Sequence, residues 1–303
     1  MINIRDEISP LKTVIVGIAI DRGKQDHVHN ATNFYYQQLG QSPKDEQLIA
    51  QLEQFSDLLK QRGVQVIHPL NLPQTGQIFV RDLGFVIGDT FVWSNPKKPQ
   101  RVKEKEGLQP IIASLGVKTW ELPPQVNIEG GDVVIWQNSL LVGIGDKGDR
   151  RRSDPEAIDI LAEQFSDWQV IPIYTKASDN PEDDPKSRIL HLDCGFTPLG
   201  QNYALFYPGG FSQPPEFILD QIKPENLITV SGEEMFHLTA NLVSLDPTTV
   251  ISDLRFSRVN QILRNHGFEV IETPYGEVAK LGGLFRCSTL PLERAKLNLK
   301  ISE

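Results

Sequence analysis

The chain has 303 residues, 39% of them hydrophobic, and a net charge of -9. This acidic balance argues against nucleic acid as the main partner. The sequence has no apolar run of about 18 residues, so no membrane partner is expected. Two cysteines are too few for a disulfide framework, and the N-terminus lacks an apolar signal core. We expect a cytoplasmic protein with free thiols whose residues 1–303 form a single domain; a homo-oligomer is compatible with these features.

One local pattern recurs at intervals of roughly 50 residues, a spacing typical of propellers and arrays. It is an apolar strand that often follows a glycine and ends at or near a proline. The copies are predicted at 63–69, 116–123, 167–172, 225–230 and 267–274. Amphipathic patterns predict helices before several copies, over 45–62, from 153 onward and over 253–266.

Hairpin-like segments follow most of these strands, and they are predicted at 84–93, 133–142, 197–206 and 241–251. Residues 11–20 and 281–290, from the two ends of the chain, would together complete a fifth unit. Each unit alone would expose an apolar face, and a closed ring buries all of these faces. The sequence therefore predicts an α/β fold of five helix–strand–hairpin units around a central site. For the proline-flanked loop at 181–185 there are two interpretations: a lid over the site, or an ordinary surface loop.

Chemically useful side chains fall at related places in the five units. Each lies between a repeat strand and the following hairpin, or where the hairpin begins. A closed ring would bring these junctions to one central mouth, although they are far apart in the sequence. The residues are Asp82, Glu129, His191, Asn241 and Cys287.

Cys287 is the candidate nucleophile, because it follows two glycines and enters a strand-like run. A free thiol has a pKa near ~8.5, so it needs a base, a positive neighbour or a cationic substrate to react at neutral pH. Arg286 is adjacent, but strand alternation points it the other way, which leaves His191 as the natural partner. The alternative is a buried cysteine that acts as a small hydrophobic residue.

The segment 189–193 is apolar apart from His191 and Asp193, and strand alternation would place these two side chains on one face. The same alternation would point Cys194 away from the site, so we expect a structural role for it. A lone histidine is more often structural, and the paired aspartate favours function here.

Two acidic motifs complete the set. Glu129 and Asp132 flank two glycines, a pattern that suits a bulge or a close approach of the backbone; the alternative is a plain turn. Asp82 follows Arg81 within an apolar run, and for Arg81 we favour a structural ion pair with Asp82.

Several carboxylates around a thiol would raise its pKa, which is unfavourable for a neutral substrate. They suit a guanidinium, which is planar, cationic and rich in N–H donors that carboxylates bind in pairs. No His-x-x-His or Cys-x-x-Cys spacing predicts a metal site, and no glycine-rich phosphate loop predicts a nucleotide cofactor. We expect neither a metal nor a cofactor.

In this order, the motifs resemble those of the guanidino-group-modifying superfamily, which includes arginine deiminases, amidinotransferases and dimethylarginine dimethylaminohydrolases. The resemblance runs from the Phe-x-Arg-Asp segment at 79–82 to the segment 287–294, which begins with the candidate nucleophile. It implies a five-bladed α/β propeller (pentein-like), which agrees with the five predicted units.

The resemblance also implies roles for the residues. Cys287 would attack the guanidino carbon and form a covalent thiouronium-type intermediate. His191 would protonate the departing amine and then activate the acceptor, while Glu129 would orient the histidine or bind the guanidinium. Asp82 and Asp193 would hold guanidinium nitrogens.

Two further roles follow from motif matches. Asp132 matches the second acid of the family's Glu-Gly-Gly-Asp motif and would support the site. Arg152, in an Arg-Ser-Asp segment similar to the Arg-Thr-Asn motif of the dimethylaminohydrolases, would contact a substrate carboxylate.

The subfamily signals are mixed. Phe-x-Arg-Asp and His-Leu-Asp resemble the deiminases and amidinotransferases, whereas Gly-Gly-Leu before the cysteine is similar to the dimethylaminohydrolases. The segment Leu284–Arg286 departs from the glycine run and histidine of the deiminases. The leading hypothesis is a C–N hydrolase that acts on an arginine-like guanidine and gives a ureido product and ammonia or an amine. The alternatives are an amidinotransferase that uses an acceptor amine, and a non-catalytic binding propeller.

Overall fold

A computed structural model describes residues 2–23, 30–148, 151–178 and 180–296. The helices and strands follow one another in the order listed here, with 3-10 helices written η: β1 (Leu11–Val16), α1 (Ala31–Gln38), α2 (Asp45–Gln61), β2 (Gln65–Ile67), η1 (Val80–Leu83), β3 (Gly84–Ile87), β4 (Thr90–Trp93), α3 (Pro99–Leu115), β5 (Lys118–Glu121), η2 (Gly130–Asp132), β6 (Val133–Trp136), β7 (Ser139–Gly145), α4 (Glu156–Gln164), β8 (Gln169–Thr175), η3 (Leu192–Cys194), β9 (Phe196–Leu199), β10 (Tyr203–Phe206), η4 (Pro208–Gly210), α5 (Glu216–Gln221), η5 (Pro224–Asn226), β11 (Leu227–Thr229), α6 (Gly232–Phe236), β12 (Val243–Asp246), β13 (Thr249–Asp253), α7 (Ser257–Asn265), β14 (Glu269–Thr273), α8 (Gly276–Ala279) and β15 (Thr289–Arg294).

The described strands form five three-stranded sheets of one design. In each sheet the middle strand pairs antiparallel with one neighbour and parallel with the other, as β7 does with β6 and β8. In four of the five sheets the antiparallel pair is a hairpin of consecutive strands. The five predicted repeat strands are the parallel ones: β2, β5, β8, β11 and β14. The five-unit prediction from the sequence is therefore confirmed.

The fifth sheet joins the two ends of the chain. β1 pairs antiparallel with β15, with Val16 opposite Thr289, and parallel with β2. The prediction that residues 11–20 and 281–290 complete a fifth unit is confirmed in that β1 and β15 close the ring. The predicted C-terminal segment is displaced, because β15 begins only at Thr289 and residues 281–288 form turns ahead of it.

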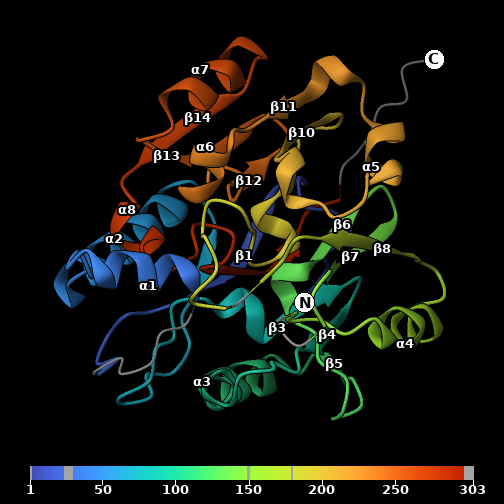
Figure 1. Ribbon diagram of the computed structural model, residues 1–303. Helices are drawn as coiled ribbons and strands as arrows, with labels where there is room; N and C mark the ends of the chain where they lie inside the picture. The colour runs from blue at the N-terminus through green and yellow to red at the C-terminus, as the bar shows by residue number, and fades with distance from the viewer. Residues whose placement is uncertain (1, 24–29, 149–150, 179, 297–303) are drawn as a thin grey trace.

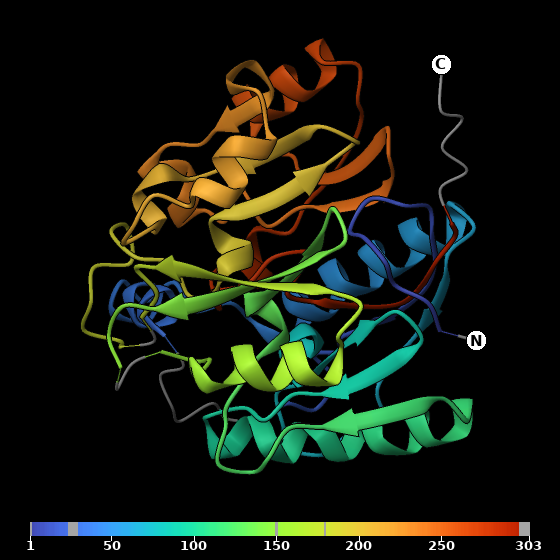
Figure 2. The same cartoon turned by 90° about the vertical axis from the view of Figure 1, so that its right-hand side faces the viewer.

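Helices lie on the outside of this ring (Figure 1). Around the picture, α2 is at the left, α3 at the bottom, α4 at the lower right, α5 at the upper right and α7 at the top, in chain order. The second view, turned by 90°, shows the sheets stacked one above another with helices along their outer edges (Figure 2). This is the α/β propeller that the resemblance implied. No helix within the described ranges has the length and apolar character needed to cross a bilayer.

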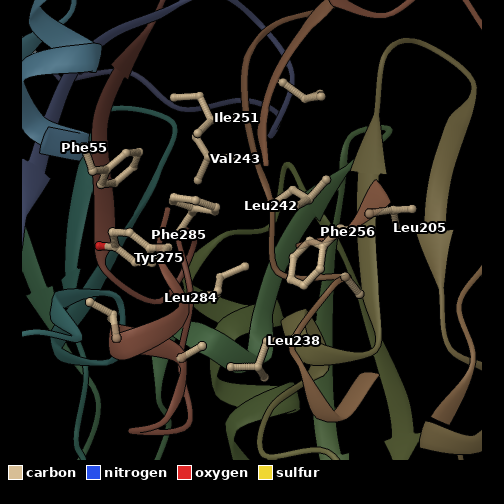
Figure 3. Packing of buried hydrophobic residues seen from close by; sticks show 14 of the residues in the cluster. Phe55, Leu205, Leu238, Leu242, Val243, Ile251, Phe256, Tyr275, Leu284 and Phe285 are labelled. Carbon is tan, nitrogen blue, oxygen red and sulfur yellow. The ribbon is translucent and has the colours of Figure 1, made fainter. Parts of the chain in front are cut away.

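A buried aromatic cluster supports the segment that leads to Cys287 (Figure 3). Phe285 stacks on Tyr275 with ring centroids 4.3 Å apart, and Phe55 of α2 lies 5.1 Å from Phe285. All three side chains are fully buried. The turn before β15 is therefore anchored to the core immediately ahead of Cys287.

The helices α1, α3, α5, α6 and α8 were not among those predicted from amphipathic patterns in the sequence, and α3 is the longest of them. α3 contains an internal proline, Pro110, and a charged sequence with few regularly spaced apolar residues. Such a pattern argues against an amphipathic helix, yet Leu108 and Ile112 are buried and hold α3 against the ring.

Candidate active site

A cleft of about 270 Å³ opens at the centre of the ring. Asp82, His191 and Cys287 all line it, and they come from three different units. Three short 3-10 helices, η1, η2 and η3, carry or border the predicted junction residues. The prediction that distant junctions meet is confirmed for these residues.

Backbone and side-chain hydrogen bonds join the junctions directly. The Arg81 N–H donates to the Cys287 carbonyl oxygen at 3.1 Å, and the Leu192 N–H donates to Asp132 Oδ1 at 3.0 Å. The Cys287 N–H donates to Asn241 Oδ1 at 3.1 Å, so the fourth junction holds the backbone of the candidate nucleophile. The five junctions act as one buried network rather than as separate loops.

The two glycines between Glu129 and Asp132 permit a close approach, as the sequence predicted. A Cβ atom on Gly130 would lie 2.1 Å from the Arg81 carbonyl oxygen. On Gly131 it would lie 2.7 Å from His191 Nδ1 and 2.9 Å from Asp82 Oδ1. A side chain at either position would push the first three junctions apart.

His191 is fully buried between carboxylates. Its Nε2 lies 2.8 Å from Glu129 Oε2, and its Nδ1 lies 3.7 Å from Asp82 Oδ1. Burial alone would lower the pKa of His191, but the charges of Asp82, Asp132 and Glu129 raise it to about 10. The imidazole is therefore protonated at neutral pH, and its Nδ1 has no hydrogen-bond partner among the described residues.

Glu129 lies behind His191 and has its own counter-ion. Arg152 Nη1 donates to both Glu129 oxygens, at 3.1 and 2.9 Å. Burial would raise the pKa of Glu129, but Arg152 and His191 hold it well below its usual range. Ser153 accepts from the Glu129 N–H and donates to Asp132 Oδ2 at 2.7 Å. The Arg-Ser-Asp segment thus fixes the Glu-Gly-Gly-Asp motif, and Arg152 also lines the cleft.

Cys287 is 3% exposed and has a second thiol beside it. The sulfur atoms of Cys287 and Cys194 and a carboxylate oxygen of Asp193 lie within 4.8 Å of one another. The expectation that Cys194 points away from the site is wrong. The hydrogen bond with Cys194, burial and the charge of Asp193 all raise the pKa of Cys287 well above its usual value. The thiol is therefore protonated in the unliganded protein.

Strand alternation fails at this place because residues 192–194 form η3 instead of a strand. The turn places Asp193 and Cys194 beside Cys287, while His191 contacts Glu129. Asp193 is fully buried, and its Oδ2 is 3.9 Å from Cys287 Sγ. Strand alternation predicted His191 and Asp193 on one face, and the backbone at η3 does not support that placement.

Arg286 neutralises Asp193 from the side away from the cleft. Its Nη1 donates to Asp193 Oδ2 at 2.8 Å, and its Nη2 donates to Glu7 Oε1 at 2.7 Å and to the Val133 carbonyl oxygen. The expectation that Arg286 does not act directly on the thiol agrees with these contacts. Leu284 and Phe285, the other two residues of the departing segment, are fully buried in the core and do not line the cleft.

Arg81 does not form the expected pair with Asp82. Its Nε donates to the Arg286 carbonyl oxygen. Asp82 instead faces Arg101, 3.6 Å from Oδ2, and the imidazole of His191, 3.7 Å from Oδ1. The tight 3-10 turn of η1 sends consecutive side chains in different directions. Burial raises the pKa of Asp82, although His191 and Arg101 oppose this shift.

Three charged residues near the site were missed. Arg101 and Glu104 enter the cleft wall from the unpredicted helix α3, and Glu7 reaches Arg286 from the N-terminal segment. The sequence signal for Arg101 and Glu104 was the i, i+3 spacing of their opposite charges, which is common on exposed helices. No signal in the sequence indicated Glu7.

Two clusters have donor atoms close enough to hold a metal ion: Asp82 with Glu129 and His191, and Asp193 with the two cysteines. Each carboxylate in them already faces an arginine, since Arg101 pairs with Asp82, Arg152 with Glu129 and Arg286 with Asp193. A protonated His191 is also not a metal ligand. The arrangement suits a cationic substrate better than a metal ion.

The family follows from sequence comparison. The family model described as "N,N dimethylarginine dimethylhydrolase, eukaryotic" matches residues 24–294. The chain belongs to this family. It is a guanidino-group-modifying enzyme, and the family of its model is one of C–N hydrolases.

Individual proteins support this assignment. The chain is 32% identical over 241 residues to the uncharacterized protein YkgA of Bacillus subtilis, covering 79% of this chain and 78% of YkgA. It is 28% identical over 246 residues to AgrE of a Nostoc species, a bifunctional arginine dihydrolase/ornithine cyclodeaminase. The match covers 79% of this chain and only 33% of AgrE.

Solved structures agree on the fold. A variant of AgrE in complex with L-arginine superposes with a TM-score of 0.79 at 24% identity, over 96% of this chain and 40% of that chain. The amidinotransferase SxtG from Microseira wollei superposes with a TM-score of 0.76 at 18% identity, over 97% of this chain and 98% of that chain. Hydrolases and an amidinotransferase thus share this architecture.

Proposed function

We propose that the enzyme hydrolyses a C–N bond in the guanidino group of an arginine-like substrate, through a covalent thiouronium intermediate on Cys287. The observation that carries the proposal is the shared cleft of Cys287, His191 and Asp82, with His191 held by Glu129 at 2.8 Å. A nucleophile, a proton donor and a guanidinium-binding carboxylate thus meet around one space.

Substrate binding would place the guanidinium against Asp82. A guanidino carbon at bonding distance from Cys287 Sγ also brings its nitrogens toward Asp193, whose Oδ2 is 3.9 Å from that sulfur. The positive charge of the substrate lowers the pKa of the thiol, which the surrounding groups otherwise raise. Because His191 is already protonated, it does not accept the thiol proton. The cation of the substrate instead lowers the pKa of the thiol, which releases its proton to solvent through the cleft as the thiolate forms.

The reaction then proceeds in two steps, formation of the covalent intermediate and its hydrolysis. The thiolate attacks the guanidino carbon, the C–S bond forms, and the C–N bond breaks as His191 Nδ1 gives its proton to the departing amine. Neutral His191 next takes a proton from water, which attacks the same carbon. The C–O bond forms and the C–S bond breaks, releasing a ureido product and restoring the thiolate.

Glu129 and Arg152 hold the imidazole so that Nε2 is occupied and Nδ1 remains for this transfer. Asp132 fixes the backbone at Leu192, next to His191. Arg152 also lines the cleft, where it would meet a substrate carboxylate together with Arg101. These roles are consistent with those that the resemblance implied.

The test is mass spectrometry of the intact protein combined with turnover of a guanidine panel. 2-Chloroacetamidine should add one covalent label, on Cys287 and not on Cys194. Arginine or an N-methylated arginine should give a ureido product without an added amine, and Cys287→Ser should abolish turnover while the far-UV spectrum and melting temperature stay the same.

Two outcomes would contradict the proposal. Product that forms only when glycine or ornithine is added would show an amidinotransferase, because the acceptor then replaces water. Equal turnover by Cys287→Ser and the wild-type enzyme would rule out the covalent mechanism.

A further inference from the structure

Glu104 of α3 is a buried carboxylate on the cleft wall that the proposed mechanism leaves without a role. It is 5% exposed and lines the same cleft as Cys287 and His191. Its Oε2 atom has no hydrogen-bond partner within the described residues. A buried carboxylate oxygen without a donor is costly, and at the wall of a binding cleft it marks a place where a ligand donor would be favourable.

The neighbour of Glu104 is shared with the guanidinium site. Arg101 Nε lies 3.2 Å from Glu104 Oε1, while Arg101 Nη2 lies 3.6 Å from Asp82 Oδ2 and donates to the Phe79 carbonyl oxygen. One arginine therefore stands between two carboxylates. If Asp82 and Glu104 are both ionised, these two carboxylates and Arg101 together have a net negative charge. A second cation, from a ligand, would neutralise it.

The raised pKa of Glu104 is also consistent with a binding site for a cationic group. Burial raises the pKa of Glu104 to about 8, although Arg101 opposes the shift. At neutral pH the carboxyl is mostly protonated in the free enzyme. A cationic group bound beside it would favour ionisation, so binding would release a proton.

We propose that Glu104 binds the ammonium group of the substrate, and so selects guanidines that have an amino group at the end of a short carbon chain. Asp82 and Glu104 are separated by about one guanidinium group, since both contact Arg101. A chain of a few carbons between guanidinium and ammonium spans such a distance. This inference rests on the proposed function, because it takes the guanidinium of the same substrate to lie on Asp82.

The rest of the cleft wall suits an amino-acid substrate. Lys98 and Lys103 line the cleft on the same side as Glu104, at the start of α3. Together with Arg101 and Arg152, these cations would attract a substrate carboxylate while the substrate ammonium is bound by Glu104. The competing interpretation is that Glu104 is only a counter-ion that positions Arg101.

The experiment is calorimetric binding to the full-length Cys287→Ser protein, in which the ligand is not consumed. Three ligands differ in one group each: L-arginine has both ammonium and carboxylate, 5-guanidinopentanoate lacks the ammonium, and agmatine lacks the carboxylate. Each is titrated into the parent and into Glu104→Gln, with Glu106→Gln, an exposed residue of the same helix, as the control. Melting curves establish that all variants are folded, and Glu104→Asp tests rescue.

The expected result is a change in ligand preference. Glu104→Gln should lower the affinity for L-arginine and agmatine by roughly 10- to 100-fold, which is the usual effect of losing a charge-assisted hydrogen bond. The affinity for 5-guanidinopentanoate should fall much less. Titrations repeated in buffers of different ionisation enthalpy measure the protons released on binding. Binding of L-arginine should release a proton from the parent protein and not from Glu104→Gln. In the enzyme that retains Cys287, KM should rise more than kcat falls.

A uniform loss for all three ligands would overturn the inference, because it would show that Glu104 acts through Arg101. Unchanged affinity for L-arginine would overturn it as well. If the ligands bind with the expected preference but the wild-type enzyme forms no ureido product, the proposed hydrolysis fails while the role of Glu104 stands.

Discussion

The sulfur of Cys194 lies within 4.8 Å of the sulfur of Cys287, in the buried junction between η3 and the turn before β15. The two thiols come from different units of the ring, so only the closed fold brings them together. Asp193 lies beside both. The proposed nucleophile, Cys287, therefore lies in surroundings that disfavour a thiolate unless a cation is bound nearby.

Replacing Cys194 should make Cys287 more acidic. The hydrogen bond with Cys194 is the main cause of the raised pKa of Cys287, followed by burial and Asp193. In Cys194→Ala, the pH midpoint for alkylation of Cys287 by iodoacetamide should therefore move down. Peptide mass spectrometry would follow the Cys287 adduct, with Cys287→Ser as the blank. An upward shift would mean that Cys194 instead donates to the thiolate and stabilises it.

The pKa of His191 should control the alkaline limit of activity. In the proposed mechanism His191 acts as an acid, so kcat should fall as pH rises through its pKa of about 10. Glu129→Gln removes one of the charges that raise this pKa, so the alkaline limb should move toward neutral pH. The same change should also lower kcat by about 10- to 100-fold, because the imidazole loses a charged partner.

Profiles of kcat from about pH 6 to 11 would test this point. Glu121→Gln, an exposed residue at the end of β5, is the matched control and should leave the profile unchanged. An alkaline limb that stays in place in Glu129→Gln would show that another group sets it.

Glu7 should stabilise the fold only above acidic pH. Burial would raise the pKa of Glu7, but Arg286 and Arg81 lower it from 4.5 to about 2. A carboxylate with a lowered folded-state pKa contributes stability that is full above about 4.5 and is lost as pH falls toward about 2. A shift of this size corresponds to about 3 kcal/mol of unfolding free energy.

Glu7→Gln should therefore lower the unfolding free energy at pH 7 by about 3 kcal/mol, and by much less near pH 3. Urea denaturation of both proteins at several pH values measures this difference. Glu53→Gln, an exposed change on α2, serves as the control. A gap of constant size at every pH would show that the contribution of Glu7 is not electrostatic.

The five repeated units of the fold could be predicted from the sequence for a physical reason. The five units could be predicted because the spacing of apolar residues and the positions of turn residues are local signals. The pairing of the two ends of the chain followed from the need to bury the apolar face of the last unit. The junction residues could then be brought together by the closure of the ring alone. This reasoning needs no knowledge of individual side-chain directions.

Side-chain directions at the junctions could not be predicted in the same way. Strand alternation was applied to residues 192–194, which form a 3-10 helix, so Cys194 was placed on the wrong side. Arg81 was paired with its sequence neighbour Asp82, although the 3-10 helix η1 sends the two side chains in different directions. These helices contain only three or four residues each, too few to show a period in the sequence. Glu104 was missed because its helix has an internal proline and no clear apolar stripe.

Phe285 should fix the position of the nucleophile through packing. It is fully buried, stacks on Tyr275 at 4.3 Å, and lies two residues before Cys287 in a turn closed by the Ser288 hydroxyl, which donates to the Leu284 carbonyl oxygen. Phe285→Ala would leave a cavity and should cost about 3 to 5 kcal/mol of unfolding free energy, and Phe285→Leu should cost less. Because the turn can then shift, kcat should fall more than KM rises.

The control is a phenylalanine in another part of the core. Phe165 packs on Trp120 at 5.6 Å in a separate cluster, so Phe165→Ala should lose stability without a specific loss of kcat. Urea denaturation and steady-state kinetics, at a temperature where every variant is folded, would separate the two effects. Equal losses of kcat in Phe285→Ala and Phe165→Ala would mean that activity follows global stability. A loss confined to Phe285→Ala would show that the aromatic stack sets where Cys287 lies relative to Asp193 and His191.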